Sequence, residues 1–387
     1  MTKTFGLLFG ACLIAPSALA EHPVAFRVQV LAIDSNEGCA IADFDNDGYL
    51  DVSAGRSWYR NPGNDGPWTP RPLRLIGERN GYSQTNGEFA YDVDGDGWTD
   101  VIAGSFWDEN VYWYRNPGKV DLERGTLWQQ NVLIETGQNT NEVGAFVQVA
   151  GGRDSRPEWV ANQWNKNKPT IVWHADDQGT YSGHTIGPKS GHGIGFGDIN
   201  NDGRDDILTG SGWYERPEGD PFAGAWAFHA DWDIKLPCPF IVQDLNGDGR
   251  ADLFWGSSHD YGLFVWFGEG VDEQGKLKFR EIKIDEPTSQ LHAMLLADLD
   301  GDGRAEMITG KRVRGHNGRD PGSNEPPQVI YYSWDEGFEN VQRHVAADGT
   351  AGIGLQIRTA DLDGDGDLEI VVPGKDGTQI LWNLSKE

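Results

Sequence analysis

The stretch DINNDGRDDIL, Asp198 to Leu208, decides the predicted fold because it crowds acidic and amide side chains around a single glycine. Asp198, Asn200 and Asp202 stand at positions 1, 3 and 5 of a loop, and Gly203 at position 6 permits a sharp turn. Side chains at this spacing converge on a hard cation such as Ca²⁺. An EF-hand would continue to a glutamate at position 12 and a helix, but here an acid at position 9 begins a strand-like run. The pattern therefore predicts a calcium loop that leads into a β-strand.

The same loop occurs six times along the chain. The alternative is a set of acidic turns without metal, but several carboxylates within a few ångströms repel one another unless a cation neutralises them. We therefore expect about six structural Ca²⁺ ions. The predicted ligands are Asp43, Asp45, Asp47 and Asp51; Asp92, Asp94, Asp96 and Asp100; Asp198, Asn200, Asp202 and Asp206; Asp244, Asn246, Asp248 and Asp252; Asp298, Asp300, Asp302 and Glu306; and Asp361, Asp363, Asp365 and Glu369.

The spacing of the loops indicates a repeat of about 50 residues, with one double gap in which residues 144–164 lack the acidic triplet. One unit reads as four strands, A to D, at 89–92, 100–104, 111–118 and 128–135. Several short strands per repeat are typical of a propeller blade. The last repeat lacks a fourth strand, and residues 25–34 can supply it. We predict an all-β, single seven-bladed β-propeller over residues 21–387, with calcium loops between strands A and B and closure by the N-terminal strand.

The first 20 residues have the features of a secretory signal peptide: Lys3, an apolar run and the cleavage motif Ala18-Leu19-Ala20. We expect cleavage near Ala20, a periplasmic or secreted protein, and no membrane insertion. The chain has a net charge of −28, and losing Lys3 makes it −29. Such acidity disfavours nucleic acid as a partner. The two remaining cysteines, Cys39 and Cys238, are expected to be free and buried, although the compartment permits a disulfide.

The acidic loops resemble the FG-GAP/VCBS repeat, as in integrin α-subunit propellers, over nearly all of the mature chain. Six of the seven units match this pattern, and the third departs from it. Residues 191–217 and 291–322 resemble more specifically the propeller of aldos-2-ulose dehydratase-type proteins, which are metal-dependent enzymes acting on keto-sugars. This resemblance implies sugar dehydration or isomerisation, but the chain is too short for the cupin-like domains of those enzymes.

The channel mouth opposite the calcium loops is the predicted functional face. Counting back six residues from the first aspartate of each loop reaches His192 and His292 at the same repeat position, and Glu88 and Glu142 stand close to this level. Converging histidines and acids favour a metal centre or an acid/base pair. The alternative is that a wet, polar channel mouth merely hydrogen-bonds its histidines.

The loops at this face carry further candidate ligand contacts. Aromatic rings such as Trp107 and Trp164 can stack on sugars, whereas blade packing is the alternative role for such residues. The loop 310–327 collects basic residues in an acidic protein, which favours an anionic ligand or a developing enolate, although local salt bridges are the alternative. We predict Arg56, Glu88, Trp107, Glu142, Trp164 and His259 as substrate-binding residues.

Two functions follow from these residues. The first is a carbohydrate-active lyase or dehydratase that acts by β-elimination or isomerisation on a keto-sugar or uronate. Its catalytic residues would be His192, His292, Lys311, Arg312 and His316, with an additional divalent metal in the channel. The alternative is a non-catalytic, calcium-stabilised propeller that binds a glycan or a protein. A carbohydrate ligand is expected, and the oligomeric state is left open.

Overall fold

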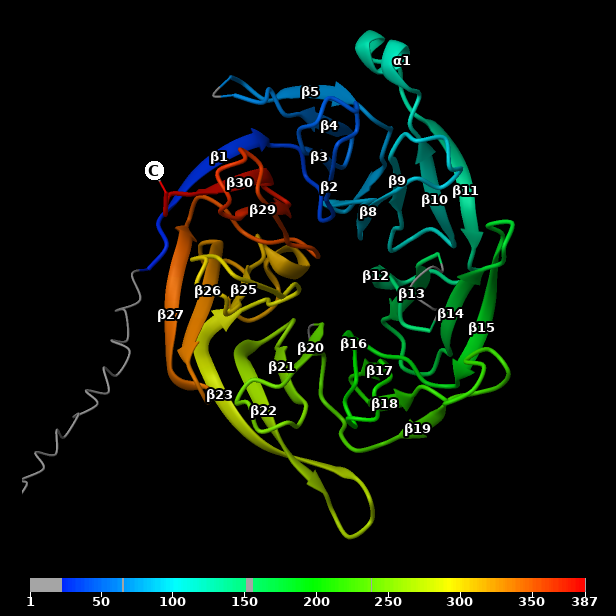
Figure 1. Cartoon of the computed structure of the whole chain (residues 1–387), viewed down its shortest axis with the longest axis vertical. Coiled ribbons are helices and arrows are strands. Elements are labelled where there is room, and N and C mark those ends of the chain that lie inside the picture. The colour runs from blue at the N-terminus through cyan, green and yellow to red at the C-terminus, as the bar shows by residue number, and fades with distance from the viewer. Residues whose placement is uncertain (1–22, 65, 151–155, 238, 387) are drawn as a thin grey trace, which may run out of the picture.

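The computed structural model describes residues 23–386 with the exception of 65, 151–155 and 238. Short sheets stand around a common centre in a β-propeller arrangement (Figure 1). The predicted signal peptide and Cys238 lie outside the described residues. In the described part of the chain, no helix has the length and apolar character needed to cross a membrane.

Six sheets form the propeller within the described ranges. Five of them contain four strands each, and in every one of these sheets neighbouring strands are antiparallel. Their strands are β2 (Ala40–Ala42), β3 (Asp51–Ala54), β4 (Ser57–Arg60) and β5 (Thr69–Pro72); β8 (Glu88–Tyr91), β9 (Asp100–Ala103), β10 (Asn110–Arg115) and β11 (Gln129–Glu135); β12 (Asn141–Val147), β13 (Glu158–Gln163), β14 (Thr170–Ala175) and β15 (Tyr181–Gly187); β24 (Leu295–Ala297), β25 (Glu306–Lys311), β26 (Gln328–Asp335) and β27 (Glu339–Asp348); and β28 (Arg358–Ala360), β29 (Glu369–Gly374), β30 (Gly377–Asn383) and β1 (Phe26–Ala32).

The sixth sheet of the propeller has eight strands, because two antiparallel four-stranded halves join at their inner edges through the parallel pair β16 and β20. Its strands are β16 (Ile194–Gly197), β17 (Asp206–Thr209), β18 (Gly212–Glu215), β19 (Ala227–His229), β20 (Phe240–Gln243), β21 (Asp252–Gly256), β22 (Tyr261–Val271) and β23 (Leu277–Ser289). The remaining elements lie in connections: a hairpin of β6 (Glu78–Arg79) and β7 (Tyr82–Ser83), the helix α1 (Lys119–Arg124) and the 3₁₀ turn η1 (Gly315–Gly318).

The predicted strands of the repeat agree with β8, β9, β10 and β11 to within three residues at each boundary. The degenerate third unit also forms its first two strands, β12 and β13, without an acidic loop. The N-terminal strand β1 pairs antiparallel with β30, with Phe26 opposite Asn383. The first and last strands of the described chain therefore share one sheet.

The second strand of each acidic repeat is buried along its whole length, as in β3, β9 and β17. Such strands read as nearly continuous apolar runs because neighbouring sheets cover both of their faces. Trp58 and Trp213 are also buried, with exposures of 2% and 3%, so they belong to the packing between sheets.

The acidic loops connect the first and second strands of their sheets, and a shared hydrogen-bond pattern shapes them. In all six, the carboxylate at position 1 accepts the backbone N–H of the glycine at position 6. The acid at position 9 accepts the N–H of position 2, as when Asp51 binds Phe44 N at 3.1 Å. The acids at positions 1 and 9 therefore hold the turn through backbone contacts.

Candidate metal centre at the channel mouth

Four side chains from different sheets meet at the end of the channel opposite the acidic loops. Glu142 lies near the start of β12, His192 and His292 precede β16 and β24, and His259 lies in the loop between β21 and β22. All four residues are buried. Because the first strand of each sheet lines the centre of the ring, residues at the start of these strands approach one another (Figure 1).

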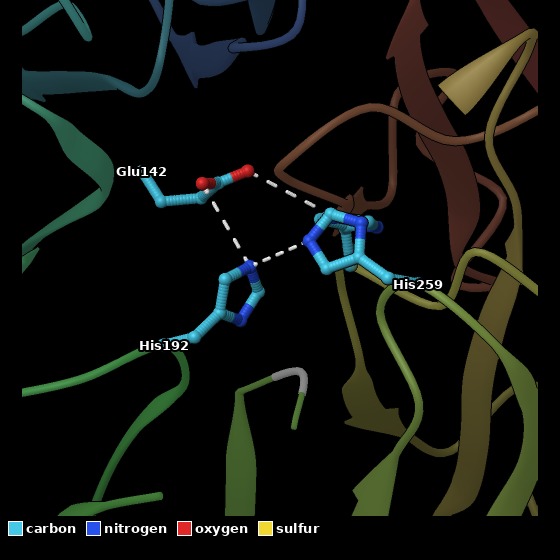
Figure 2. A group of neighbouring side chains, drawn as sticks. Glu142, His192 and His259 are labelled. Carbon is cyan, nitrogen blue, oxygen red and sulfur yellow. Dashed lines mark hydrogen bonds and ion pairs between the residues drawn. The ribbon is translucent and has the colours of Figure 1, made fainter. Parts of the chain in front are cut away.

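The potential ligand atoms of these residues are close together. One nitrogen or oxygen from each of Glu142, His192, His259 and His292 lies within 4.8 Å of the others. The Nε2 atoms of His192 and His259 are 3.0 Å apart. Glu142 approaches His192 Nε2 at 3.7 Å and His292 Nε2 at 3.9 Å. Figure 2 shows the side chains of Glu142, His192 and His259 pointing toward one another.

The other ring nitrogen of each histidine has an acceptor of its own. His192 Nδ1 donates to Pro237 O at 2.7 Å, and His292 Nδ1 donates to Gln290 O at 3.1 Å. His259 Nδ1 lies 2.8 Å from Asp320 Oδ2. In a neutral imidazole whose Nδ1 carries the proton, Nε2 presents a lone pair. The three Nε2 atoms are therefore oriented as metal ligands, and their partners form the outer shell that such ligands require.

The centre leaves polar atoms without conventional partners. His292 Nε2 is buried and has no hydrogen-bond partner among the described residues. The Nε2 atoms of His192 and His259 face each other, and two lone pairs at that distance repel unless a proton or a cation lies between them. A bound cation would satisfy all of these atoms at once.

The charge states suit a divalent cation. Burial lowers the pKa of His292 well below its ordinary range, and the charge of Arg312 adds to this effect. Burial likewise lowers the pKa of His259 to about 4, helped by the nearby His192. Burial alone would raise the pKa of Glu142, but the neighbouring His192 and the charge of Arg312 hold this pKa below its usual range. The centre thus combines two neutral imidazoles with an ionised carboxylate, which are the protonation states that bind metal.

Asp320 and His316 form a second layer beside His259. The Asp320 carboxylate accepts from His259 Nδ1 at 2.8 Å and lies 2.9 Å from His316 Nδ1. The rings of His259 and His316 are stacked, with centroids 4.2 Å apart. His316 has a left-handed backbone with φ of 45°, as do Arg314 and Asn317. Left-handed non-glycine residues are strained, and such strain gathers at functional sites.

The predicted basic residues of the loop 310–327 have different surroundings. Arg312 is buried and forms an ion pair with Glu37, with its Nε 3.1 Å from Glu37 Oε1. Lys311 is buried and its ammonium donates to Gly322 O. His316 is 40% exposed at its side chain, so it alone of these three reaches solvent substantially.

The predicted substrate-binding residues do not all lie together. Glu142 and His259 lie in the centre. Arg56 forms ion pairs with Asp34 at 2.6 Å and Glu78 at 2.9 Å, and Trp107 is half-buried. The carboxylate of Glu88 is buried against Arg74 and also accepts from Ser53 and Gly55, so its hydrogen-bonding capacity is used within the fold.

Trp164 is 53% exposed and lines a cavity of about 350 Å³ that also contacts His192. The same cavity is lined by Lys166 and Lys235, whose side chains are exposed, and by Asp233. An aromatic face beside charged groups is suited to a polar ring with an apolar face.

Asp320 is a residue of the site that the sequence pattern does not single out. From the sequence, Asp320 is expected only as a local salt-bridge partner for the basic residues of the loop 310–327. Glu142 and His259 are predicted as substrate-binding residues, whereas the structure places them in the centre. The signal present in the sequence is the acid four residues after His316. That spacing alone does not show that Asp320 also reaches His259, which lies 61 residues away in the chain.

Acidic loops bring potential ligand oxygens within 4.8 Å of one another, as in Asp43, Asp45 and Asp51; Asp92, Asp94 and Asp96; and Asp298, Asp300 and Asp302. Arginines also reach these acids, as in Arg60 with Asp45 at 2.5 Å and Arg115 with Asp94 at 2.6 Å. Part of the loop charge is therefore compensated within the fold.

Comparison with known proteins supports the repeat. Residues 244–309, which contain two of the acidic loops, match the family described as FG-GAP-like repeat. Together with the arrangement of sheets, this match supports a β-propeller that carries an FG-GAP-like repeat at residues 244–309. No curated protein sequence matches the chain. Among solved structures, the crystal structure of the V. cholerae biofilm matrix protein Bap1 is similar, with 10% identity, a TM-score of 0.45, and coverage of 93% of this chain and 91% of that chain.

Proposed function

We propose that this protein is a metal-dependent, carbohydrate-active lyase or dehydratase whose active site is the channel mouth. The observation that carries this proposal is the convergence of His192, His259, His292 and Glu142, with the histidines' Nε2 atoms directed at the carboxylate and at one another. Imidazole nitrogens with one carboxylate suit zinc and other divalent transition metals better than calcium. A merely structural cluster would not leave His292 Nε2 buried without a partner.

These four residues would hold the ion. When bound there, a divalent metal supplies Lewis acidity that polarises a carbonyl oxygen of the substrate and favours an enolate. In this assignment, His192 and His292 are metal ligands. Of the two interpretations that the sequence favours for these histidines, a metal centre and an acid/base pair, the proposal adopts the metal centre. Their Nδ1 contacts to backbone carbonyls keep the rings in the required tautomer.

Proton transfer falls to His316. Its Nδ1 is engaged by Asp320, which leaves Nε2 on a half-exposed ring at the edge of the centre. An imidazole oriented by a carboxylate serves as a general acid or base. In a β-elimination, a proton next to a carbonyl is removed and a β-oxygen departs with a proton, so His316 would serve one of these transfers and Asp320 would position it.

The substrate is proposed to be a keto-sugar or uronate. Support comes from the cavity beside His192, where the exposed ring of Trp164 offers a stacking surface and Lys166 and Lys235 supply positive charge. A non-catalytic glycan-binding propeller would use the same cavity and is the alternative function, because Trp164 and the lysines do not require the metal centre.

The wider architecture belongs to the same proposal. We infer seven blades by treating the eight-stranded sheet as two blades, and we infer that β1 closes the ring in the last blade; the pairing of β1 with β30 supports this closure. The acidic loops are proposed to bind structural Ca²⁺, supported by their clustered oxygens. Export to the periplasm or the medium is proposed from the N-terminal segment.

The test is elemental analysis of dialysed protein, compared with Glu142→Gln and His292→Ala variants and with His184→Asn as a control. His184 lies in β15 and binds Gly224 O, away from the centre. We expect one transition-metal ion per chain in the wild type and in the His184→Asn control. The Glu142→Gln and His292→Ala variants should bind this metal at least about tenfold more weakly. Calcium would stay unchanged in all four proteins.

Activity is then tested by following the ultraviolet absorbance of an unsaturated product with keto-sugars and uronates. Metal-dependent product formation that is lost in His316→Ala, with the metal retained, supports the lyase. A wild type without any transition metal after growth and refolding in Zn²⁺, Mn²⁺ or Fe²⁺ would contradict the metal centre. Metal without turnover, combined with saturable glycan binding that depends on Trp164, would favour the binding module.

A further inference from the structure

The opposite end of the central channel contains a second cavity, of about 420 Å³. It lies where the first strands of several sheets run into the acidic loops, and its walls come from β2, β8, β12 and β28 and from residues just before β3 and β13. Most of its lining is apolar or aromatic, including Phe89, Tyr91 and Phe146. One side chain in the lining carries a positive charge, and this is Arg358.

Arg358 differs from the buried arginines Arg74 and Arg312. Arg74 is paired with Glu88, and Arg312 is paired with Glu37. Arg358 has no carboxylate within ion-pair distance among the described residues. Its guanidinium donates to two backbone oxygens, Ile357 O at 3.4 Å and Glu88 O at 3.2 Å, and lies 5.5 Å from the centroid of the Phe89 ring.

Among the described residues, the ionisable groups that act on Arg358 are Glu88 and Cys39, and neither forms an ion pair with it. The Glu88 carboxylate is already bound by Arg74, Ser53 and Gly55. Burial raises the pKa of the Cys39 thiol to about 12, so this thiol is neutral. A partly buried guanidinium without a counter-charge is costly, and the cost is relieved when an anion binds.

We propose that this cavity binds a small carboxylate carried on an aromatic or apolar body. The guanidinium fork of Arg358 matches a carboxylate through two parallel hydrogen bonds. The rings of Phe89, Tyr91 and Phe146 would receive the apolar body, which an inorganic anion lacks. A cavity of this size is within the range of small-molecule sites.

This site is separate from the metal centre and does not depend on the proposed activity. Gln356, two residues before Arg358, accepts hydrogen bonds from Cys39 N and Glu88 N, both at 2.9 Å. These contacts join three sheets across the channel between its mouth and the cavity. A ligand at Arg358 would therefore bind from the face of the acidic loops.

The experiment is isothermal titration of the full-length protein, in calcium buffer without added carboxylates, using benzoate as the probe and benzamide as its neutral analogue. Wild type is expected to bind benzoate saturably and benzamide at least about tenfold more weakly. Arg358→Met should lose benzoate affinity by at least about tenfold. Arg27→Met is the matched control. The guanidinium of Arg27 lies 5.5 Å from the centroid of the Trp382 ring, and that of Arg358 lies at the same distance from the Phe89 ring. Arg27, however, is exposed and lies outside the cavity lining.

A second variant guards against misfolding of Arg358→Met. Ala360→Phe fills the cavity from the same strand while keeping the guanidinium, and it should also abolish benzoate binding. The melting temperature of ligand-free Arg358→Met should equal or exceed that of wild type, since the uncompensated charge is gone. The proposal is overturned if wild type gives no saturable heat with benzoate, if either cavity variant binds as wild type does, or if benzamide binds equally well.

Discussion

Replacing Arg312 by methionine should destabilise the protein strongly, because it leaves the Glu37 carboxylate buried without its counter-charge. The side chains of Arg312 and Glu37 are 3% and 4% exposed, and they lie 275 residues apart in the sequence. Among the described residues, Arg312 is the one side chain that donates to this carboxylate. Breaking a buried ion pair by removing one partner costs about 3–5 kcal/mol, most of it the penalty of the remaining charge.

The assay is urea unfolding followed by tryptophan fluorescence, with calcium and the channel metal at saturation. The double variant Glu37→Gln/Arg312→Met removes both charges and should recover at least about 2 kcal/mol relative to Arg312→Met. Lys278→Met is the control, since the pair Lys278–Glu269 is exposed and separated by 3.5 Å, and its loss should cost less than about 1 kcal/mol. A loss below about 1 kcal/mol for Arg312→Met, or equal losses in the single and double variants, would refute the reasoning.

Three further outcomes are expected. EGTA should lower the melting temperature and Ca²⁺ should restore it, since each site held at about 100 times its Kd adds about 2.7 kcal/mol to the free energy of unfolding; an unchanged melting temperature contradicts calcium binding. Burial lowers the pKa of Lys375 to about 8. The rate at which Lys375 is acylated, measured by mass spectrometry, should therefore rise about tenfold per pH unit below pH 8 and level off above it. The acylation rate of Lys386 should instead keep rising through pH 9. The buried Cys39 thiol, whose pKa burial raises to about 12, should resist iodoacetamide at pH 8 until the protein unfolds; rapid labelling of the folded protein would contradict its burial.

Much of the fold was predictable because the repeat is encoded locally. The acids at positions 1 and 9 of each loop bind backbone N–H groups within eight residues, so the motif determines its own turn and the start of the next strand. The order of strands then follows from a period of about 50 residues and apolar runs. The parallel joining of β16 to β20 was not predicted, since it depends on how closely two neighbouring sheets approach.

The candidate site was predictable only in part. His192 and His292 share a repeat position, and this periodicity alone is enough to predict both at the channel mouth. Glu88 stands close to the same repeat position, yet the structure pairs its carboxylate with Arg74. His259 reaches the centre from a different loop, whose path is irregular and leaves no periodic signal.

The sequence by itself determined the acidic turns, the short strands and the propeller class, because each depends on contacts between residues close in the chain. Only the tertiary structure decided which side chains meet. The centre draws on residues from 142 to 320, and the cavity at Arg358 on residues from 40 to 360. Closing a ring brings these distant residues together, and their distances depend on the rotation between sheets, which no local pattern encodes.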